Sequence, residues 1–242
     1  MKFNKTFLAV LSMWVAGSAQ AALIDRGGGL LYDDVLNVTW LQDANYAKTS
    51  GYSDTIGYVS GGNLKWNDAK TWTENLVYGG YSDWRLPKVT LGTPLVNGVD
   101  YSYIAPSVNS ELGYMFLVNL GLKSYRLPFP STTLQPDYGV HRNGDSGGQE
   151  NVGLVINLRS DPYWYGNSWH APFTATHAWS FDYITGGQGG LQKTSSSYVW
   201  AVRDGDVASV AAPIPEPETY AMLLAGLGLL GFIARRRNRR PS

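Results

Sequence analysis

The chain has 242 residues with 19 basic and 19 acidic side chains, a formal net charge of zero at pH 7, and no cysteine. The lack of cysteine excludes a disulfide framework, a thiol nucleophile and a thiolate metal site. Two basic residues precede Ala22 and five follow Asp206, whereas only two acids lie outside that range. The segment between them therefore keeps 12 basic and 17 acidic residues, and its net charge of −5 argues against nucleic acid or anionic lipid as a partner.

The first 21 residues have the order of a secretory signal peptide. Lys2 and Lys5 precede an almost purely apolar run from Phe7 to Ala16, and Ala19 and Ala21 are the small residues that a signal peptidase accommodates. The alternative is a retained N-terminal anchor, but the run is too short for one. We therefore expect cleavage after Ala21.

Residues 22–207 have the length of one domain with a substantial core. Two short strands are predicted in it at Leu30–Tyr32 and Val38–Leu41, on either side of a polar turn at Asp33-Asp34. From Lys65 to Leu76 the apolar spacing changes to that of a helix. The domain therefore begins with β structure and continues with a helix.

Capping residues set the expected ends of two helices. Asn63 is the expected N-cap of the helix from Lys65 to Leu76, and Gly79-Gly80 is its stop. A second helix is expected from Ser110 or Glu111 to Leu120, with Gly121 just past its end.

The second half of the domain predicts β structure. Strands are expected at Val152–Leu158, His177–Ile184 and Tyr198–Val202, separated by Gly- and Ser-rich turns. Short helices in the first half followed by antiparallel strands in the second predict an α+β fold rather than a parallel sheet.

Tryptophan is abundant, with eight of the nine residues inside the domain. Half-exposed aromatic side chains suit stacking against sugar rings, and the same side chains also fill β-rich cores. For any individual tryptophan the core interpretation is favoured.

Several segments together resemble the Lcl C-terminal domain family over about residues 30–203. They are Val38–Ala44, Gly79–Pro87, Tyr163-Trp164, Ala178–Phe181 and Val199–Arg203. The resemblance implies a C-type lectin-like fold on a secreted or surface protein; some family members are adhesins that bind sulfated polysaccharide. This chain lacks the cysteines of many members and has a long insertion after Pro87, so ligand preference is not carried over.

The most specific part of that resemblance is Asp83-Trp84-Arg85-Leu86-Pro87. Arg85 is expected to pair with Asp83 or with another acid, and Pro87 is expected to end the extended segment. These features favour a structural staple over a ligand site.

The three histidines complete neither a catalytic nor a metal site. Gly144–Gly148 has the string found around the serine of chymotrypsin-like proteases, but His141 lies on the same loop and cannot act as its base. We interpret 141–150 as a flexible polar loop. His170 and His177 fall on either side of a proline rather than on one helix, so no ligand geometry follows.

Calcium is the one cation that the acidic residues suggest. Asp204-Gly205-Asp206 together with Asp33-Asp34 offers several carboxylate oxygens, although such turns are more often only solvated. Trp66-Asn67-Asp68 resembles a string of calcium-dependent lectins, but here it opens a predicted helix rather than lying on a strand. No metal or other cofactor is predicted.

The C-terminal residues form three consecutive features. Pro215-Glu216-Pro217 stiffens a linker at 208–218. In the final segment, 219–242, an apolar stretch from Tyr220 to Ala234 is followed by Arg235-Arg236-Arg237. As a helix the stretch rises about 22 Å in a hydrocarbon core about 30 Å thick. The arginines would stop it on the cytoplasmic side.

These three features resemble a PEP-CTERM sorting signal of Gram-negative bacteria. The resemblance implies a transient inner-membrane helix, cleavage near the prolines by an exosortase, and release or attachment of the mature protein at the cell surface or in the extracellular matrix. The alternative is a plain single-span anchor.

Three functions are consistent with the sequence. The favoured one is a non-catalytic surface or matrix protein whose candidate ligand is polysaccharide. The second is an extracellular hydrolase that uses carboxylates such as Asp145, Glu150 or Asp161. The third is a structural surface component without a ligand. The expected partners are signal peptidase, an exosortase-like enzyme and the membrane, and not nucleic acid.

Overall fold

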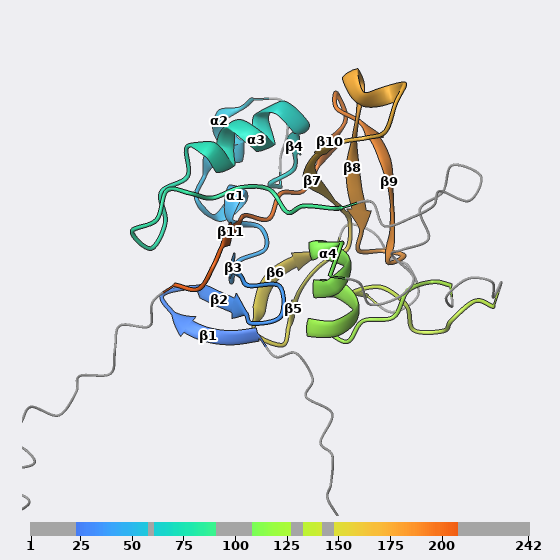
Figure 1. Cartoon of the computed structure of the whole chain (residues 1–242), viewed down its shortest axis with the longest axis horizontal. Coiled ribbons are helices and arrows are strands. Elements are labelled where there is room, and N and C mark those ends of the chain that lie inside the picture. The colour runs from blue at the N-terminus through green and yellow to red at the C-terminus, as the bar shows by residue number, and fades with distance from the viewer. Residues whose placement is uncertain (1–22, 58–60, 91–107, 127–132, 142–147, 208–242) are drawn as a thin grey trace, which may run out of the picture. The chain divides into compact units, whose positions relative to one another are not determined.

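A computed structural model of the chain describes residues 23–57, 61–90, 108–126, 133–141 and 148–207 (Figure 1). The chain divides into two units, Met1–Asp206 and Val207–Ser242. Among the described residues, none of the helices has the length and apolar character needed to cross a membrane. The expected processing, anchoring and catalytic residues that lie outside the described residues are Ala19, Ala21, Asp145, Pro215, Glu216, Pro217, Arg235, Arg236 and Arg237.

The ends of the domain meet in one antiparallel sheet of order β1-β2-β3-β11. Its strands are β1 (Leu23–Gly27), β2 (Leu30–Asp33), β3 (Val38–Leu41) and β11 (Val202–Asp204). The expected strands on both sides of Asp33 are confirmed as β2 and β3. Asp33 accepts hydrogen bonds from the backbone N–H groups of Val35 and Leu36 at 3.0 and 2.9 Å, which closes the turn between them.

The helices are short and precede most of the remaining strands. They are α1 (Tyr46–Thr49), α2 (Tyr52–Thr55), α3 (Trp66–Glu74) and α4 (Glu111–Tyr114), and α4 continues into a π-helix, η2 (Met115–Asn119). The expected second helix is confirmed, with Ser110 Oγ accepting the N–H of Gly113 at 3.0 Å. Gly121 follows with a positive φ of 60°.

The prediction of the N-cap of α3 is wrong by two residues, and the helix begins one residue later than expected. Its N-cap is Lys65 rather than Asn63, and Lys65 makes no side-chain cap. Leu64 and Lys65 form the two-residue strand β4 (Leu64–Lys65), which pairs with β10 (Ser196–Ser197). Because this pairing keeps both residues extended, the helix begins only at Trp66.

The second half is β structure, as expected, but its strands are divided differently. They are β5 (Gln149–Val152), β6 (Val155–Arg159), β7 (Pro162–Ser168), β8 (His177–Asp182) and β9 (Gly187–Gln192). The single strand expected at Val152–Leu158 is the β5–β6 hairpin, which turns at Gly153 with a φ of 59°. β7, β8 and β9 form a separate antiparallel sheet. The fold is thus largely β with a few short helices.

Most tryptophans belong to the core, as the favoured interpretation expected. Seven of the eight in the domain are buried: Trp40, Trp66, Trp72, Trp84, Trp164, Trp179 and Trp200. Their indole N–H groups often bind backbone carbonyls far away in sequence. Trp200 donates to Leu41 at 2.7 Å, and Trp164 donates to Leu64 at 2.8 Å. Trp169 is the partly exposed exception.

Candidate functional site

The segment Asp83–Pro87 lies beside β11, the last strand of the domain. Arg85 and Val202 exchange two backbone hydrogen bonds of 2.8 and 2.9 Å. Trp84 and Leu86 are both 3 % exposed, so this short bridge is backed by the core. The segment therefore extends the four-stranded sheet beyond β11.

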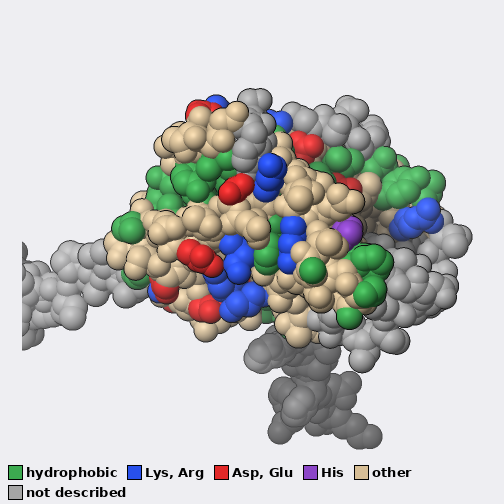
Figure 2. Space-filling view, turned by 90° about the horizontal axis from the view of Figure 1, so that it is seen from above, with side chains coloured by type: hydrophobic (Ala, Val, Ile, Leu, Met, Phe, Trp, Pro, Cys, Tyr) green, Lys and Arg blue, Asp and Glu red, His purple; other side chains and the backbone are tan. Residues whose placement is uncertain are grey.

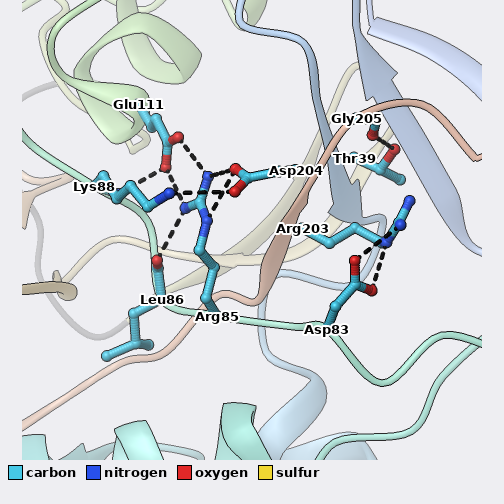
Figure 3. Close-up of polar contacts among 9 residues, drawn as sticks. All are labelled: Thr39, Asp83, Arg85, Leu86, Lys88, Glu111, Arg203, Asp204 and Gly205. Atoms are coloured by element: carbon cyan, nitrogen blue, oxygen red, sulfur yellow. Dashed lines mark hydrogen bonds and ion pairs between the residues drawn. The ribbon is translucent and has the colours of Figure 1, made fainter.

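The guanidinium of Arg85 is held by two carboxylates from distant parts of the chain (Figure 3). It forms two hydrogen bonds of 2.8 Å to Glu111 at the start of α4, and it also binds Asp204 at the end of β11. A further bond of 3.1 Å reaches the carbonyl of Leu86. Each of the five guanidinium N–H groups therefore has an acceptor in the described part of the chain, and none is left for a ligand.

Asp83 pairs with Arg203 and not with Arg85, the partner that the sequence suggested. Arg85 pairs with other acids, while the carboxylate of Asp83 accepts hydrogen bonds of 2.8 and 2.9 Å from Arg203 on β11. The same guanidinium lies 4.1 Å from the ring centroid of Tyr81. The hydrogen bonds from Arg203 hold the pKa of Asp83 below its ordinary value.

The end of the segment ties two further elements to the sheet. The carbonyl of Pro87 accepts the N–H of Gly166 on β7 at 2.8 Å. The backbone N–H of Lys88 donates to Glu111 at 2.6 Å, and its ammonium lies 3.2 Å from Asp204. Residues 83–88 thus connect β11, α4 and β7, an arrangement that supports the structural-staple interpretation. We call this set of contacts the β11 staple.

The acidic turns considered for calcium are engaged by cations and backbone groups. Arg85 binds Asp204, and Arg26 binds Asp206 through two hydrogen bonds of 2.9 and 2.6 Å. Asp33 is 1 % exposed and caps the turn between β2 and β3, and its burial raises its pKa. The carboxylates of Asp33, Asp204 and Asp206 therefore already have partners within the protein.

The histidines lie in two separate places. His141 Nδ1 lies 2.9 Å from a carboxylate oxygen of Glu150 on β5. His170 and His177 pack against the ring of Trp169, with centroid distances of 4.2 and 5.7 Å. Across the described residues, no three His, Asp or Glu side chains are grouped so that they could hold a metal ion.

Of the carboxylates considered for hydrolysis, the two that the structure describes, Glu150 and Asp161, have different partners. Asp161 lies 3.7 Å from Arg159, whereas Glu150 contacts His141 and lines a cleft of about 510 Å³. Asp137 lines the same cleft as Glu150. Two acids do therefore share one cleft, but Asp137 was not among the residues that the sequence suggested.

A larger cleft, of about 720 Å³, opens between the start of α3 and the turn that joins β7 to β8. Figure 1 shows α3 and this turn at the same end of the domain, and Figure 2 shows basic, histidine and hydrophobic side chains close together on the face seen from that end. The residues that line this 720 Å³ cleft include Lys65, Asn67, Asp68, Phe173, His177 and Lys193. We call it the Phe173 cleft.

Phe173 begins a short 3-10 turn, η3 (Phe173–Ala175), and is 43 % exposed. One face of its ring stacks on Trp169, with centroids 5.4 Å apart and planes 30° apart. Trp169 in turn lies flat against β9, where a Cβ on Gly190 would come within 2.3 Å of the indole. An exposed aromatic ring is thus supported from below by a second ring and a glycine.

One sequence feature could have indicated the close packing beneath this cleft. Gly189-Gly190 interrupts a segment that the structure makes a strand, and a glycine inside a strand often marks the close approach of another group. Phe173 and Lys193 themselves carried no signal, because both are brought to the cleft by the pairing of β8 with β9.

Comparisons with known proteins agree with both resemblances. A family model described as the Lcl C-terminal domain matches residues 29–203, and one described as the PEP-CTERM protein-sorting motif matches residues 213–240. The second match indicates export to the envelope or surface of a Gram-negative cell and processing by an exosortase-like enzyme. Searches of the curated proteins and of the solved structures found no match.

Proposed function

Since the chain belongs to the Lcl C-terminal domain family and carries a PEP-CTERM sorting motif, we propose that it is a non-catalytic surface protein that binds polysaccharide through the Phe173 cleft. The observation that carries this proposal is the exposed ring of Phe173 at the edge of a cleft rich in hydrogen-bonding side chains. A sugar ring presents an apolar face to an aromatic ring and hydroxyl groups to polar side chains, so the two features are complementary to it.

The acids among the described lining residues of the Phe173 cleft bear on whether the cleft could be catalytic. Among the described residues that line the Phe173 cleft, Asp68 is the only acid. Glycoside hydrolysis ordinarily needs two carboxyl groups on opposite sides of the scissile bond. The chemistry of the lining residues therefore favours binding over cleavage.

A C-type lectin-like fold is part of the proposal. Its support is the pairing of the two ends of the domain through β1, β2, β3 and β11, together with a separate sheet made by β7, β8 and β9. In such a domain, ligand-binding loops extend from a core that closes on its own termini. The β11 staple would be the part that keeps that core closed.

Sorting by the two ends of the chain completes the proposal. Residues 1–21 act as a cleaved signal peptide, and 219–242 act as a membrane helix that holds the protein until an exosortase cuts near Pro215–Pro217. The intact mass of protein recovered from the cell surface tests this. We expect an N-terminus at Ala22 and the loss of the arginine cluster; an uncut C-terminus would leave a plain membrane anchor.

Polysaccharide binding is tested by a glycan array and by pull-down on the exopolysaccharide of the producing cells. The test variant is Phe173→Ala, and Val77→Ala is the matched control because Val77 is 71 % exposed and does not line the cleft. We expect Phe173→Ala to weaken binding by about tenfold, or about 1.4 kcal/mol, since the sugar would lose the aromatic face on which it stacks. Equal binding by both variants, or no binding by the unmodified protein, contradicts the proposal.

The shared cleft of Glu150 and Asp137 supports one alternative, an extracellular hydrolase. Incubation of the same exopolysaccharide with the protein, followed by a reducing-end assay, distinguishes the two functions. New reducing ends that disappear in Glu150→Gln would favour the hydrolase. Neither binding nor cleavage, together with self-association of the protein, would favour a ligand-free structural component.

A further inference from the structure

Lys193 is the residue at which the walls of the Phe173 cleft meet. It directly follows β9, and its backbone joins two other elements: its N–H donates to the carbonyl of Thr176 at 2.8 Å, and its carbonyl accepts the N–H of Trp66 at 3.2 Å. Its backbone therefore connects β9 both to the start of β8 and to the start of α3.

The ammonium group of Lys193 adds three more contacts. It donates to Ser168 Oγ at the end of β7 at 2.8 Å and to the carbonyl of Thr174 in η3 at 2.7 Å. It also lies 4.2 Å from the ring centroid of Trp66. An ammonium has three donors, so two of them serve the protein and the indole face attracts the same charge.

The turn that carries Phe173 has few other contacts to fix it. Residues 171–176 are all exposed. Within the turn, the N–H of Phe173 binds His170 at 2.9 Å, and the N–H of Thr176 binds Phe173 at 3.0 Å. These local bonds shape the turn but do not attach it to the sheet. Its attachments to the sheet are the ring contacts of Phe173 with Trp169 and His177, the backbone bond from Lys193 to Thr176, and the bond from the Lys193 ammonium to Thr174.

We propose that Lys193 is a positioning residue of the Phe173 cleft, and this rests on the proposed function. Its ammonium attaches η3 to the end of β7 and to Trp66, and it thereby holds the exposed ring of Phe173 where a polysaccharide can stack on it. Lys193 acts through Phe173 rather than by contacting the ligand, because its hydrogen bonds are directed into the protein. The same lysine places the wall made by α3 and the wall made by η3 at a fixed separation.

The test compares Lys193→Met with Lys65→Met in the mature protein recovered from the cell surface. Both variants remove one positive charge from the lining of the same cleft, and the ammonium of Lys193 donates to the carbonyl of Thr174 in η3. Hydrogen exchange of the Thr176 amide reports on the turn, because its N–H is bonded to Phe173 within it. Binding is measured with the exopolysaccharide of the producing cells at several salt concentrations.

For Lys193→Met we expect exchange in residues 173–176 to become about tenfold faster and binding to become about tenfold weaker. For Lys65→Met we expect unchanged exchange in the turn. The slope of binding against salt should change no more in Lys193→Met than in Lys65→Met, because a positioning residue makes no direct charge contact with the ligand. Ser168→Ala removes one of the two acceptors and should give an intermediate effect on exchange.

Two outcomes overturn the role of Lys193. One is unchanged exchange in Lys193→Met, and the other is faster exchange with unweakened binding. A loss of binding in Lys193→Met that vanishes at high salt while the turn stays protected would make Lys193 a ligand contact instead. Failure of the unmodified protein to bind is a different result, since it overturns the proposed function together with the role of Lys193 in it.

Discussion

The β11 staple and the Phe173 cleft are both built from charged and aromatic side chains, yet they use them in opposite ways. In the staple, the guanidinium of Arg85 has every donor satisfied, and Glu111 is only 9 % exposed. In the cleft, Phe173 keeps 43 % of its surface exposed on a turn with few attachments. Charges that satisfy one another hold a fold together, whereas an incompletely covered aromatic ring offers a surface to a partner.

The comparison predicts that the staple matters most for stability. Arg85→Met should lower the free energy of unfolding by about 3–5 kcal/mol, because Glu111 would lose its partner in a buried position. Denaturant titration followed by tryptophan fluorescence measures this. Arg126→Met is the control, because Arg126 is exposed, and it should change stability by less than about 0.5 kcal/mol. An equal loss of unfolding free energy in the two variants would contradict a particular role of the β11 staple in stability.

A second substitution tests the support beneath the cleft. Gly190→Val places side-chain atoms where the indole of Trp169 lies, so it should displace Trp169 and with it Phe173. We expect a loss of about 1–3 kcal/mol in stability from overpacking, together with weaker polysaccharide binding. Gly189→Val is the control, since a Cβ at Gly189 has no neighbour within 4 Å. Thermal unfolding and pull-down measure the two effects.

Lowering the pH should weaken the β11 staple. Hydrogen bonds from Arg203 and Arg85 lower the pKa values of Asp83 and Asp204 in the folded protein. Both carboxylates therefore stabilise the fold above their ordinary pKa of about 4, and this contribution is lost as the pH falls through their lowered values. Asp204→Asn should make the melting temperature less dependent on pH below about 4. Asp137→Asn is the control, and an identical acid profile in both variants contradicts the prediction.

The smallest expected effect separates binding from folding most cleanly. Phe173→Ala should change the free energy of unfolding by less than about 1 kcal/mol, because Phe173 is 43 % exposed and lies on a surface turn, while it weakens polysaccharide binding. Calorimetric unfolding of this variant and of the unmodified protein measures the difference in stability. A large loss of stability would place Phe173 in the core of the fold rather than at a binding surface.

Local patterns predicted the elements whose ends are set by nearby residues. The β2–β3 turn follows from the capping side chain of Asp33, and α4 begins where Ser110 can cap it. The start of α3 was predicted wrongly because β10, more than a hundred residues away, keeps Lys65 extended. The glycine-rich β9 was not predicted, because glycine lowers local strand preference and the pairing with β8 overrides it.

The sequence by itself determined the family, the sorting motif and the largely β second half, because each is written in consecutive residues or in short-range alternation. It also predicted that 83–87 is a structural segment, but it did not predict the partners of its charges. Only the tertiary structure decided that Arg85 binds Glu111 and Asp204, and that Phe173 and Lys193 share a cleft with the start of α3. Strand pairing and helix packing set such contacts between residues far apart in the chain, and no local preference encodes them.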